Sequence, residues 1–201
     1  INERDQLGTS IALNADGTRV AVGARFNDGS DANAGHVRVF DYVDESWTLV
    51  GQDIEGVDPN DQTGLAVSLS ASGSRLAIGG ASNNVTLNNH GQARVYELDP
   101  ERVWQQLGSD LTGEFLTDLF GKAVALSGDG TRVAVGGFLN DGEDVSQTDA
   151  GHVRVFEYNE EQKEWQQLGS DLNGPAFGSW FGFSLSLSHS GSILAVAAPG
   201  Y

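Results

Sequence analysis

DGTRVAVG stands at Asp16–Gly23 and again, letter for letter, at Asp129–Gly136. Two further phrases recur in the same order: AGHVRVF at Ala34–Phe40 and Ala150–Phe156, and WQQLGSDL at Trp104–Leu111 and Trp165–Leu172. Self-similarity at a fixed period is typical of proteins built from stacked structural repeats. A side chain that recurs in every copy is therefore expected to belong to the scaffold, and function is sought where the copies differ.

A glycine opens each copy, and successive glycines are 56, 57 and 61 residues apart: Gly8, Gly64, Gly121 and Gly182. We treat residues 1–201 as a single segment and divide it into copies one to four. They comprise residues 5–60, 61–117, 118–178 and a shortened 179–201. Copies one to three are complete, whereas copy four contains only the first half of the pattern.

Each complete copy predicts four short strands, A to D, because runs of Val, Ile, Leu and aromatic residues alternate with turn residues. In copy one these are Ser10–Leu13, Arg19–Val22, His36–Tyr42 and Trp47–Val50. Asp-Gly or Ser-Gly joins strands A and B in a tight hairpin. The small residues of strand A suit a strand crowded around a central axis. The fold predicted is an all-β propeller of four-stranded antiparallel blades, with three complete blades and a half blade.

Composition narrows the functional classes. Eleven Lys and Arg residues against 28 Asp and Glu give a formal net charge of −17. Proteins that bind nucleic acids or anionic membranes rely on Lys and Arg, so neither partner is expected. No cysteine is present, which excludes disulfides and thiolate metal sites. No methionine is present either, and we expect the chain to be a piece of something longer. No apolar run predicts membrane insertion.

Dipeptides related to Phe-Gly open the copies, literally at Phe120-Gly121 and Phe181-Gly182. Triplets related to Gly-Ala-Pro follow strand B, as at Gly23-Ala24-Arg25 and Ala197-Ala198-Pro199, and a G-x-x-R-V-aromatic strand comes next. Over essentially its whole length the chain resembles FG-GAP repeats, the blades of integrin α-subunit propellers. WD40 repeats are shorter and end in Trp-Asp, which is absent here, and kelch repeats stay a remote alternative.

This resemblance implies an adhesive, extracellular or cell-surface protein. It also implies calcium bound by an Asp-rich hairpin, but the A–B hairpins here, such as Asn14–Gly17, hold one carboxylate each. Calcium requires six to eight oxygen ligands. We therefore do not transfer the family's calcium site to these hairpins.

The loops between strands B and C differ most between copies and are the first candidate site. Asn27, Asp28 and Asp31 lie in copy one, and Asn140, Asp141 and Asp144 in copy three. The four Asp residues among them are candidate Ca²⁺ ligands, and all six, together with Trp180, are candidate ligand-binding residues. The alternative for these loops is a solvated acidic segment. The sequon Asn84-Val85-Thr86 in the copy-two loop supports secretion.

Repeated side chains are assigned to structure. His36 and His152 occupy identical GHVRV strands and are expected to pack or to form hydrogen bonds. Three arginines within strand C are expected to pair with three aspartates after strand D, because a charge within a covered blade needs a partner: Arg38, Arg94 and Arg154 with Asp53, Asp110 and Asp171. The tryptophans Trp47, Trp104 and Trp165 are expected to pack between blades.

No nucleophile elbow, zinc-protease motif, P-loop or dinucleotide fingerprint occurs. The sequence therefore predicts a non-enzymatic extracellular binding or adhesion module for a protein or glycan ligand. The alternatives are a structural repeat of a large extracellular assembly and a carbohydrate-active propeller enzyme. Because copy four is unfinished, we expect further chain or another subunit to complete the ring.

Overall fold

The computed structural model describes residues 5–80, 90–115, 117–141 and 148–201, and every regular element in them is a β-strand. No helix in these ranges is long and apolar enough to cross a membrane. The strands are β1 (Ser10–Leu13), β2 (Arg19–Ala24), β3 (His36–Val43), β4 (Ser46–Leu49), β5 (Ile54–Glu55), β6 (Ala66–Leu69), β7 (Arg75–Gly80), β8 (Gln92–Leu98), β9 (Trp104–Gln106), β10 (Leu111–Thr112), β11 (Ala123–Leu126), β12 (Arg132–Gly137), β13 (His152–Asn159), β14 (Glu164–Gln167), β15 (Leu172–Asn173), β16 (Ser184–Leu187) and β17 (Leu194–Ala197).

Each complete copy folds into one antiparallel sheet in chain order, as β1-β2-β3-β4 illustrates. The outermost strand is split, because β4 and β5 both pair with β3, and β9/β10 and β14/β15 repeat this arrangement. Gly51 lies in the first break with φ of 72°, a left-handed conformation that glycine adopts without steric cost. The four predicted strands are thus confirmed, and the sequence pattern missed the short second half of the outermost one.

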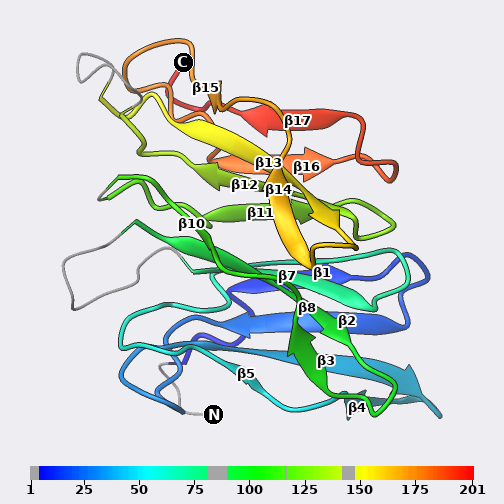
Figure 1. The fold of residues 1–201 in the computed structure, drawn as a ribbon. Coiled ribbons are helices and arrows are strands. Elements are labelled where there is room, and N and C mark those ends of the chain that lie inside the picture. The colour runs from blue at the N-terminus through cyan, green and yellow to red at the C-terminus, as the bar shows by residue number, and fades with distance from the viewer. Residues whose placement is uncertain (1–4, 81–89, 116, 142–147) are drawn as a thin grey trace.

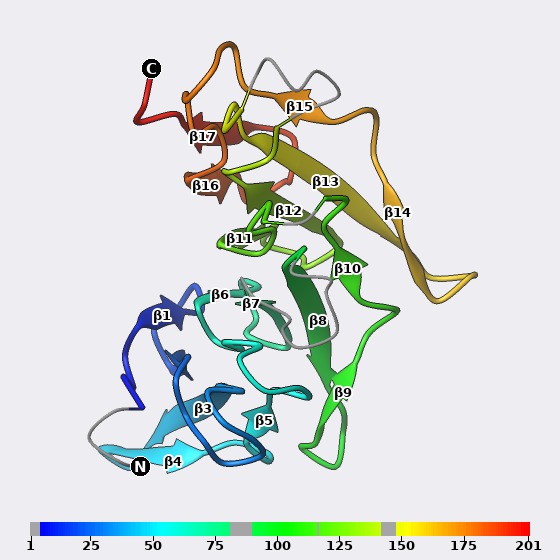
Figure 2. The same ribbon diagram turned by 90° about the vertical axis from the view of Figure 1, so that its left-hand side faces the viewer.

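The four sheets are stacked in chain order from the N-terminus to the C-terminus (Figure 1). They fan out like blades, with β1, β6, β11 and β16 adjacent at the inner side and β4, β9 and β14 at the periphery (Figure 2). The propeller of four-stranded antiparallel blades is therefore confirmed, and β16 and β17 form the half blade. The loop between β2 and β3 lies at one end of the blades, and the A–B hairpin turns lie at the other (Figure 1).

The repeated glycines allow the inner strands to approach closely. A Cβ atom at Gly79 would lie 1.9 Å from the carbonyl oxygen of Gly121 in the next blade. Within that next blade the Gly121 amide donates to the Gly136 carbonyl of β12 at 3.0 Å. Packing against the preceding blade likewise requires glycine at the start of copies two to four, at Gly64, Gly121 and Gly182, whereas a Cβ atom at Gly8 would have no neighbour within 4 Å.

Two of the three repeated tryptophans, Trp104 and Trp165, pack between blades, as predicted. Trp104 is 2% exposed, packs on Gly51 of the preceding blade and donates from Nε1 to the Val50 carbonyl at 3.1 Å. Trp165 makes the same hydrogen bond to Leu107 at 2.7 Å. Trp47, in the outermost strand β4 of the first blade, is instead 48% exposed.

A second arginine series, which the sequence analysis did not single out, joins blades at the hairpin-turn end. Arg19 binds Asp41 of its own blade at 2.6 Å and donates to the Gly73 carbonyl in the next blade's turn at 2.8 Å. Arg75 and Arg132 repeat both contacts one and two blades further along. These are the stapling arginines, and Ile193 takes their place in copy four.

A chain of backbone hydrogen bonds also runs from blade to blade through these turns. Ala15 donates to Ala71, Ala71 to Gly128, and Gly128 to His189, at 2.7 to 3.0 Å. We call this chain the turn belt.

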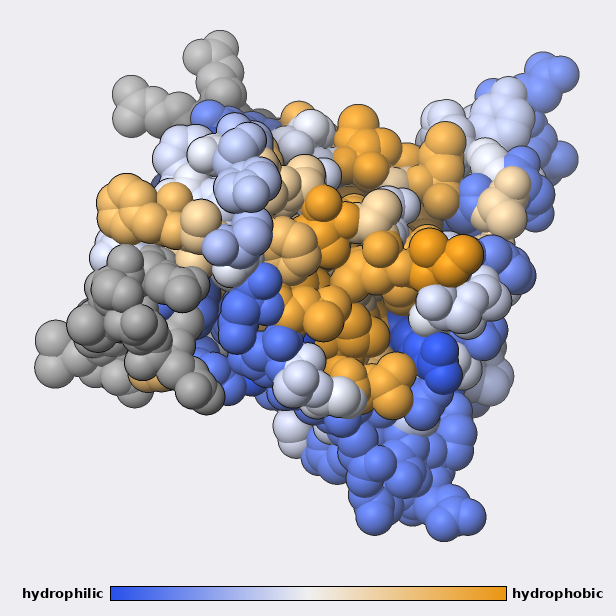
Figure 3. All heavy atoms as spheres, turned by 90° about the horizontal axis from the view of Figure 1, so that it is seen from above, coloured by the Kyte–Doolittle hydropathy of each residue, from blue (hydrophilic) through white to orange (hydrophobic). Residues whose placement is uncertain are grey.

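Apolar side chains remain exposed at both ends of the stack. Ile11 and Leu13 of β1 are 63% and 57% exposed, although their counterparts Val124 and Leu126 in copy three are buried. Viewed from above, apolar side chains gather over the side of the molecule that carries the fourth sheet (Figure 3).

Candidate functional site

The end of the blades that carries the B–C loops also carries β5, β10 and β15. At this end an imidazole and two carboxylates come together twice among the described residues. The first cluster is His36, Asp53 and Glu55, and the second is Glu114, His152 and Asp171. In each, one potential ligand atom per residue lies within 4.8 Å of the others.

Antiparallel pairing assembles the first cluster. His36 begins β3 and is the register partner of Glu55 in β5, and Asp53 stands just before that strand. The His36 side chain is 1% exposed, and Glu55 is half-buried. Gly29 of the B–C loop covers the cluster, since a Cβ atom there would lie 3.0 and 3.1 Å from the two carboxylate oxygens of Glu55.

The three groups of the first cluster have different electrostatic surroundings. Burial, and then the Arg38 charge, lowers the pKa of His36, so the ring is neutral at neutral pH. Hydrogen bonds from Arg38 lower the pKa of Asp53. Burial, and then the neighbouring Asp53 charge, raises the pKa of Glu55. The cluster therefore combines a neutral imidazole, a firmly ionised carboxylate and a more basic one.

The second cluster spans two blades. His152 Nδ1 lies 3.4 Å from Asp171 of its own blade, and Glu114 comes from the end of copy two. The His152 ring is 1% exposed and makes a T-shaped contact with the Phe120 ring, with 5.7 Å between the ring centres. Arg154 donates to Glu114 at 3.3 Å, so this carboxylate is already engaged.

Two of the three expected arginine–aspartate pairs are present. Arg38 binds Asp53 with three hydrogen bonds of 2.5 to 2.9 Å, and Arg94 binds Asp110 at 2.9 Å. The third pair is wrong. Arg154 lies over the Phe120 ring at 4.4 Å and donates to the Thr112 carbonyl and Glu114 of the preceding blade. This packing draws it away from Asp171.

The candidate residues of the B–C loops are engaged inside the protein. The Asn27 amide donates to buried Asp5 at 2.8 Å, and the Asn140 amide donates to buried Asp118 at 2.9 Å. Three of the Asp side chains accept backbone hydrogen bonds of 2.7 to 3.0 Å within their own loops: Asp28, Asp31 and Asp141. None of these three belongs to a metal-binding cluster found in the described ranges, and Asp144 and the sequon lie outside those ranges. Their roles in binding a ligand or Ca²⁺ stay predictions.

Trp180 is 40% exposed, and its amide donates to Asp149 at the end of the copy-three B–C loop. It therefore lies at the same end of the blades as the two clusters. Its role as a ligand-binding aromatic stays a prediction.

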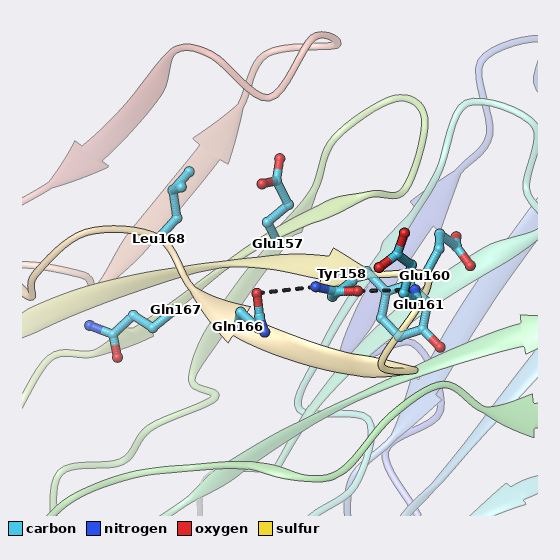
Figure 4. A pocket seen from close by; sticks show the side chains of 8 residues that line it. Glu157, Tyr158, Glu160, Glu161, Gln166, Gln167 and Leu168 are labelled. Carbon is cyan, nitrogen blue, oxygen red and sulfur yellow. Dashed lines mark hydrogen bonds between the residues drawn. The ribbon is translucent and has the colours of Figure 1, made fainter.

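A hollow at the opposite end is lined by the β13–β14 hairpin (Figure 4). Two of its three acidic residues bind the stapling arginines, and the third, Glu161, is exposed. Glu157 binds Arg132 at 2.8 Å, and Glu160 binds Arg75 at 2.9 Å. This hollow is consequently part of the contact between blades.

Recurrence in the copies predicted structural roles for His36 and Asp53, and no repeated motif in the sequence pointed to Glu55. A signal was available, because the register equivalents of Glu55 are Thr112 in copy two and Asn173 in copy three. Position 55 is therefore one of the sites where the copies differ. Recognising it required the second half of the outermost strand, which the pattern did not predict.

No protein-family model and no curated protein matches this chain. Its fold is similar to that of solved structures at low sequence identity. A periplasmic gluconolactonase of Pseudomonas aeruginosa shares 14% identity with a TM-score of 0.62, covering 95% of this chain and 50% of that one. A protein described as a 6-phosphogluconolactonase of Bacteroides uniformis shares 12% identity with a TM-score of 0.60, covering 94% of this chain and 49% of that one. Hydrazine synthase of Kuenenia stuttgartiensis shares 12% identity with a TM-score of 0.55, covering 98% of this chain and 44% of that one. The chain thus spans about half the length of these structures.

These comparisons correct two expectations. The FG-GAP assignment is wrong, because no family model supports it and the similar propellers are named otherwise. The glycines that suggested it are explained by the close approach of inner strands. The expectation of a non-enzymatic adhesion module is wrong on the same finding, since similar structures are named as lactonases.

Proposed function

We propose that this chain is part of a carbohydrate-active propeller enzyme that hydrolyses a sugar lactone, with the first cluster as its reacting centre. The observation that carries the proposal is the meeting of His36, Asp53 and Glu55 at the loop end of a blade. The names of the lactonases with a similar fold give it a substrate class.

The chemistry needs a base beside a bound water. In this scheme Glu55 takes a proton from the water. At the same time the oxygen of the water bonds to the carbonyl carbon of the lactone. The ring C–O bond then breaks, and the proton passes to the leaving alkoxide, which yields a hydroxy acid. Asp53, held by Arg38, stays ionised and orients the imidazole of His36. A positioned base of this kind contributes about 10²- to 10⁴-fold in rate.

The charge of the chain favours an uncharged lactone as substrate. With a formal net charge of −17, the protein repels phosphorylated sugars at a distance. Arg38 is already bound to Asp53 and is not available for a phosphate. We therefore expect gluconolactone to be hydrolysed faster than its 6-phosphate.

The test is the initial rate of acid release from gluconolactone, in a pH-stat, above the spontaneous rate. Glu55→Thr introduces the copy-two residue and is expected to lower kcat/KM at least 100-fold. Glu161→Gln, at an exposed position in the β13–β14 hairpin at the opposite end of the blades, is expected to leave it unchanged. Folding of each variant is checked by its melting temperature. Equal rates for the protein and Glu55→Thr would contradict the proposal.

The proposal extends to the location of the protein. A periplasmic or extracellular location is supported by the lactonase of Pseudomonas aeruginosa, which is named as periplasmic. It also includes Ca²⁺ binding by the B–C loops, which their acidic composition supports.

The proposal also includes completion of the ring by further chain or a second subunit. It is supported by the exposed apolar residues of β1, Ile11 and Leu13, whose counterparts in copy three are buried.

A further inference from the structure

We propose that the first cluster, His36, Asp53 and Glu55, binds a divalent transition-metal ion of the Zn²⁺ type. One imidazole nitrogen and two carboxylate oxygens lie within 4.8 Å of one another. Three protein ligands with a fourth position for water is the arrangement of catalytic zinc sites. This inference concerns the site on which the proposed function rests, but metal binding can be measured without any substrate.

Two buried atoms in the cluster have hydrogen-bonding capacity that the described residues leave unused. They are His36 Nε2 and Glu55 Oε2. A buried polar atom without a partner is unfavourable, because it has given up its hydrogen bonds to water. An ion coordinated by these side chains would supply the missing interaction at both residues.

The charges around the cluster also fit a dication. Asp53 and Glu55 carry two negative charges when ionised, and Arg38 offsets one of them through Asp53. His36 is 1% exposed, and an imidazole binds a metal ion through the lone pair of a ring nitrogen. Asp53 Oδ1 accepts one hydrogen bond from Arg38, which leaves it a further lone pair.

The mixed nitrogen and oxygen ligands distinguish the ion from calcium. Ca²⁺ takes six to eight oxygen ligands, whereas imidazole suits zinc and its neighbours in the first transition row. Bonds of about 2.0–2.2 Å require the three ligand atoms to draw together. A side chain at position 29 would crowd the Glu55 carboxylate, and glycine avoids this contact.

The other copies provide internal controls. Copy two has Gln92 and Thr112 at the positions of His36 and Glu55, so it lacks the imidazole and one carboxylate. Copy three keeps His152, but Asn173 replaces Glu55, and the third member of its cluster, Glu114, is bound by Arg154. The complete set contributed by one blade occurs in copy one.

The experiment is calorimetric titration of ZnCl₂ into chelator-treated protein, with melting temperature measured in parallel. We expect one tight site and a higher melting temperature with zinc. His36→Gln and Glu55→Thr, both copy-two residues, are each expected to weaken binding at least 10-fold. His152→Gln, the same change in copy three, is the matched control and is expected to leave zinc affinity unchanged.

Cobalt gives a second readout that surface binding does not mimic. Co²⁺ in place of zinc is expected to give an absorption band of a four- or five-coordinate ion, which Glu55→Thr abolishes. Absence of zinc binding, equal affinity in folded His36→Gln, or tighter binding of Ca²⁺ than of Zn²⁺ would each overturn the inference.

The two proposals fail separately. Lactone hydrolysis that depends on Glu55 but persists in chelator, without zinc binding, overturns the metal site and keeps the activity. Zinc binding that depends on His36 and Glu55, without lactone hydrolysis, keeps the metal site and overturns the activity.

Discussion

Copies one and two share the same antiparallel strand pairing but differ in the blades that flank them and in the side chains at the loop end. Both carry a strand-C arginine bound to an aspartate, and both carry a stapling arginine. Copy two lies between two blades, whereas the outer tryptophan of copy one, Trp47, is 48% exposed. At the loop end, the register pair of His36 and Glu55 in copy one corresponds to the pair of Gln92 and Thr112 in copy two. Repetition therefore identifies packing, and the departures from it identify chemistry.

The largest expected difference between the two copies is at the outer tryptophan. Trp104→Ala removes a side chain that is 2% exposed and its hydrogen bond to Val50, so we expect a loss of about 3–5 kcal/mol in the free energy of unfolding. Trp47→Ala removes mainly a ring contact with Tyr42, at 5.2 Å, and is expected to cost about 1 kcal/mol. Urea denaturation of both variants checks this. Equal losses would show that the two positions pack alike.

A smaller difference is expected between the stapling arginines. Arg75 binds Glu97, Glu160 and the Gly130 carbonyl, and it lies over the Tyr158 ring. Arg75→Met is expected to cost about 1–3 kcal/mol, because its side chain is 11% exposed but both carboxylate partners are more accessible.

Arg19→Met is the matched change in copy one. It leaves Asp41 still bound to Arg102, at 2.9 Å, and is therefore expected to cost less than Arg75→Met. Thermal unfolding of the two variants, side by side, gives the ranking, and the reverse order would contradict this account.

The smallest effect is a pH dependence in copy one. Hydrogen bonds from Arg19, and then from Arg102, lower the pKa of Asp41 below its value in the unfolded chain, about 3.9. The unfolded chain therefore binds this proton first, and the contribution of Asp41 to stability is complete above that value. It is lost as pH falls through the lower pKa of the folded state.

We expect Asp41→Asn to flatten the dependence of stability on pH below about 4, since the substituted side chain no longer titrates there. Denaturant titrations between pH 2 and 6 measure the slope for both proteins. An unchanged slope would mean that Asp41 gains nothing from its arginines.

Sequence reasoning succeeded where one residue type meets one backbone requirement. Asp-Gly and Ser-Gly predicted the hairpins, and Gly17 and Gly73 indeed have positive φ. The predicted ion pairs of the strand-C arginines formed for Arg38 and Arg94, which bind an aspartate of their own blade. The prediction failed at Arg154, whose partner Glu114 lies in the preceding blade. Pairing across blades depends on which side chains face each other after stacking, and no spacing within a copy encodes that.

The same limit applied to the first cluster. Its members are only 17 and 19 residues from His36 along the chain, but Glu55 belongs to a two-residue strand after a break in the ladder. Such a short strand has no periodicity to recognise. The family assignment failed for a different reason. Close approach of glycine backbones is a requirement of blade packing, so Phe-Gly and Gly-rich motifs arise in propellers without common membership of one family.

The turn belt has a consequence for how the molecule opens. Each of its hydrogen bonds crosses one junction between blades, from Ala15 to Ala71, from Ala71 to Gly128 and from Gly128 to His189. Because repeats that touch only their neighbours separate junction by junction, each of these amides reports on one junction. In native-state hydrogen exchange, the protection of the amides of Ala15, Ala71 and Gly128 would rank the three junctions, and thereby show from which side the stack comes apart.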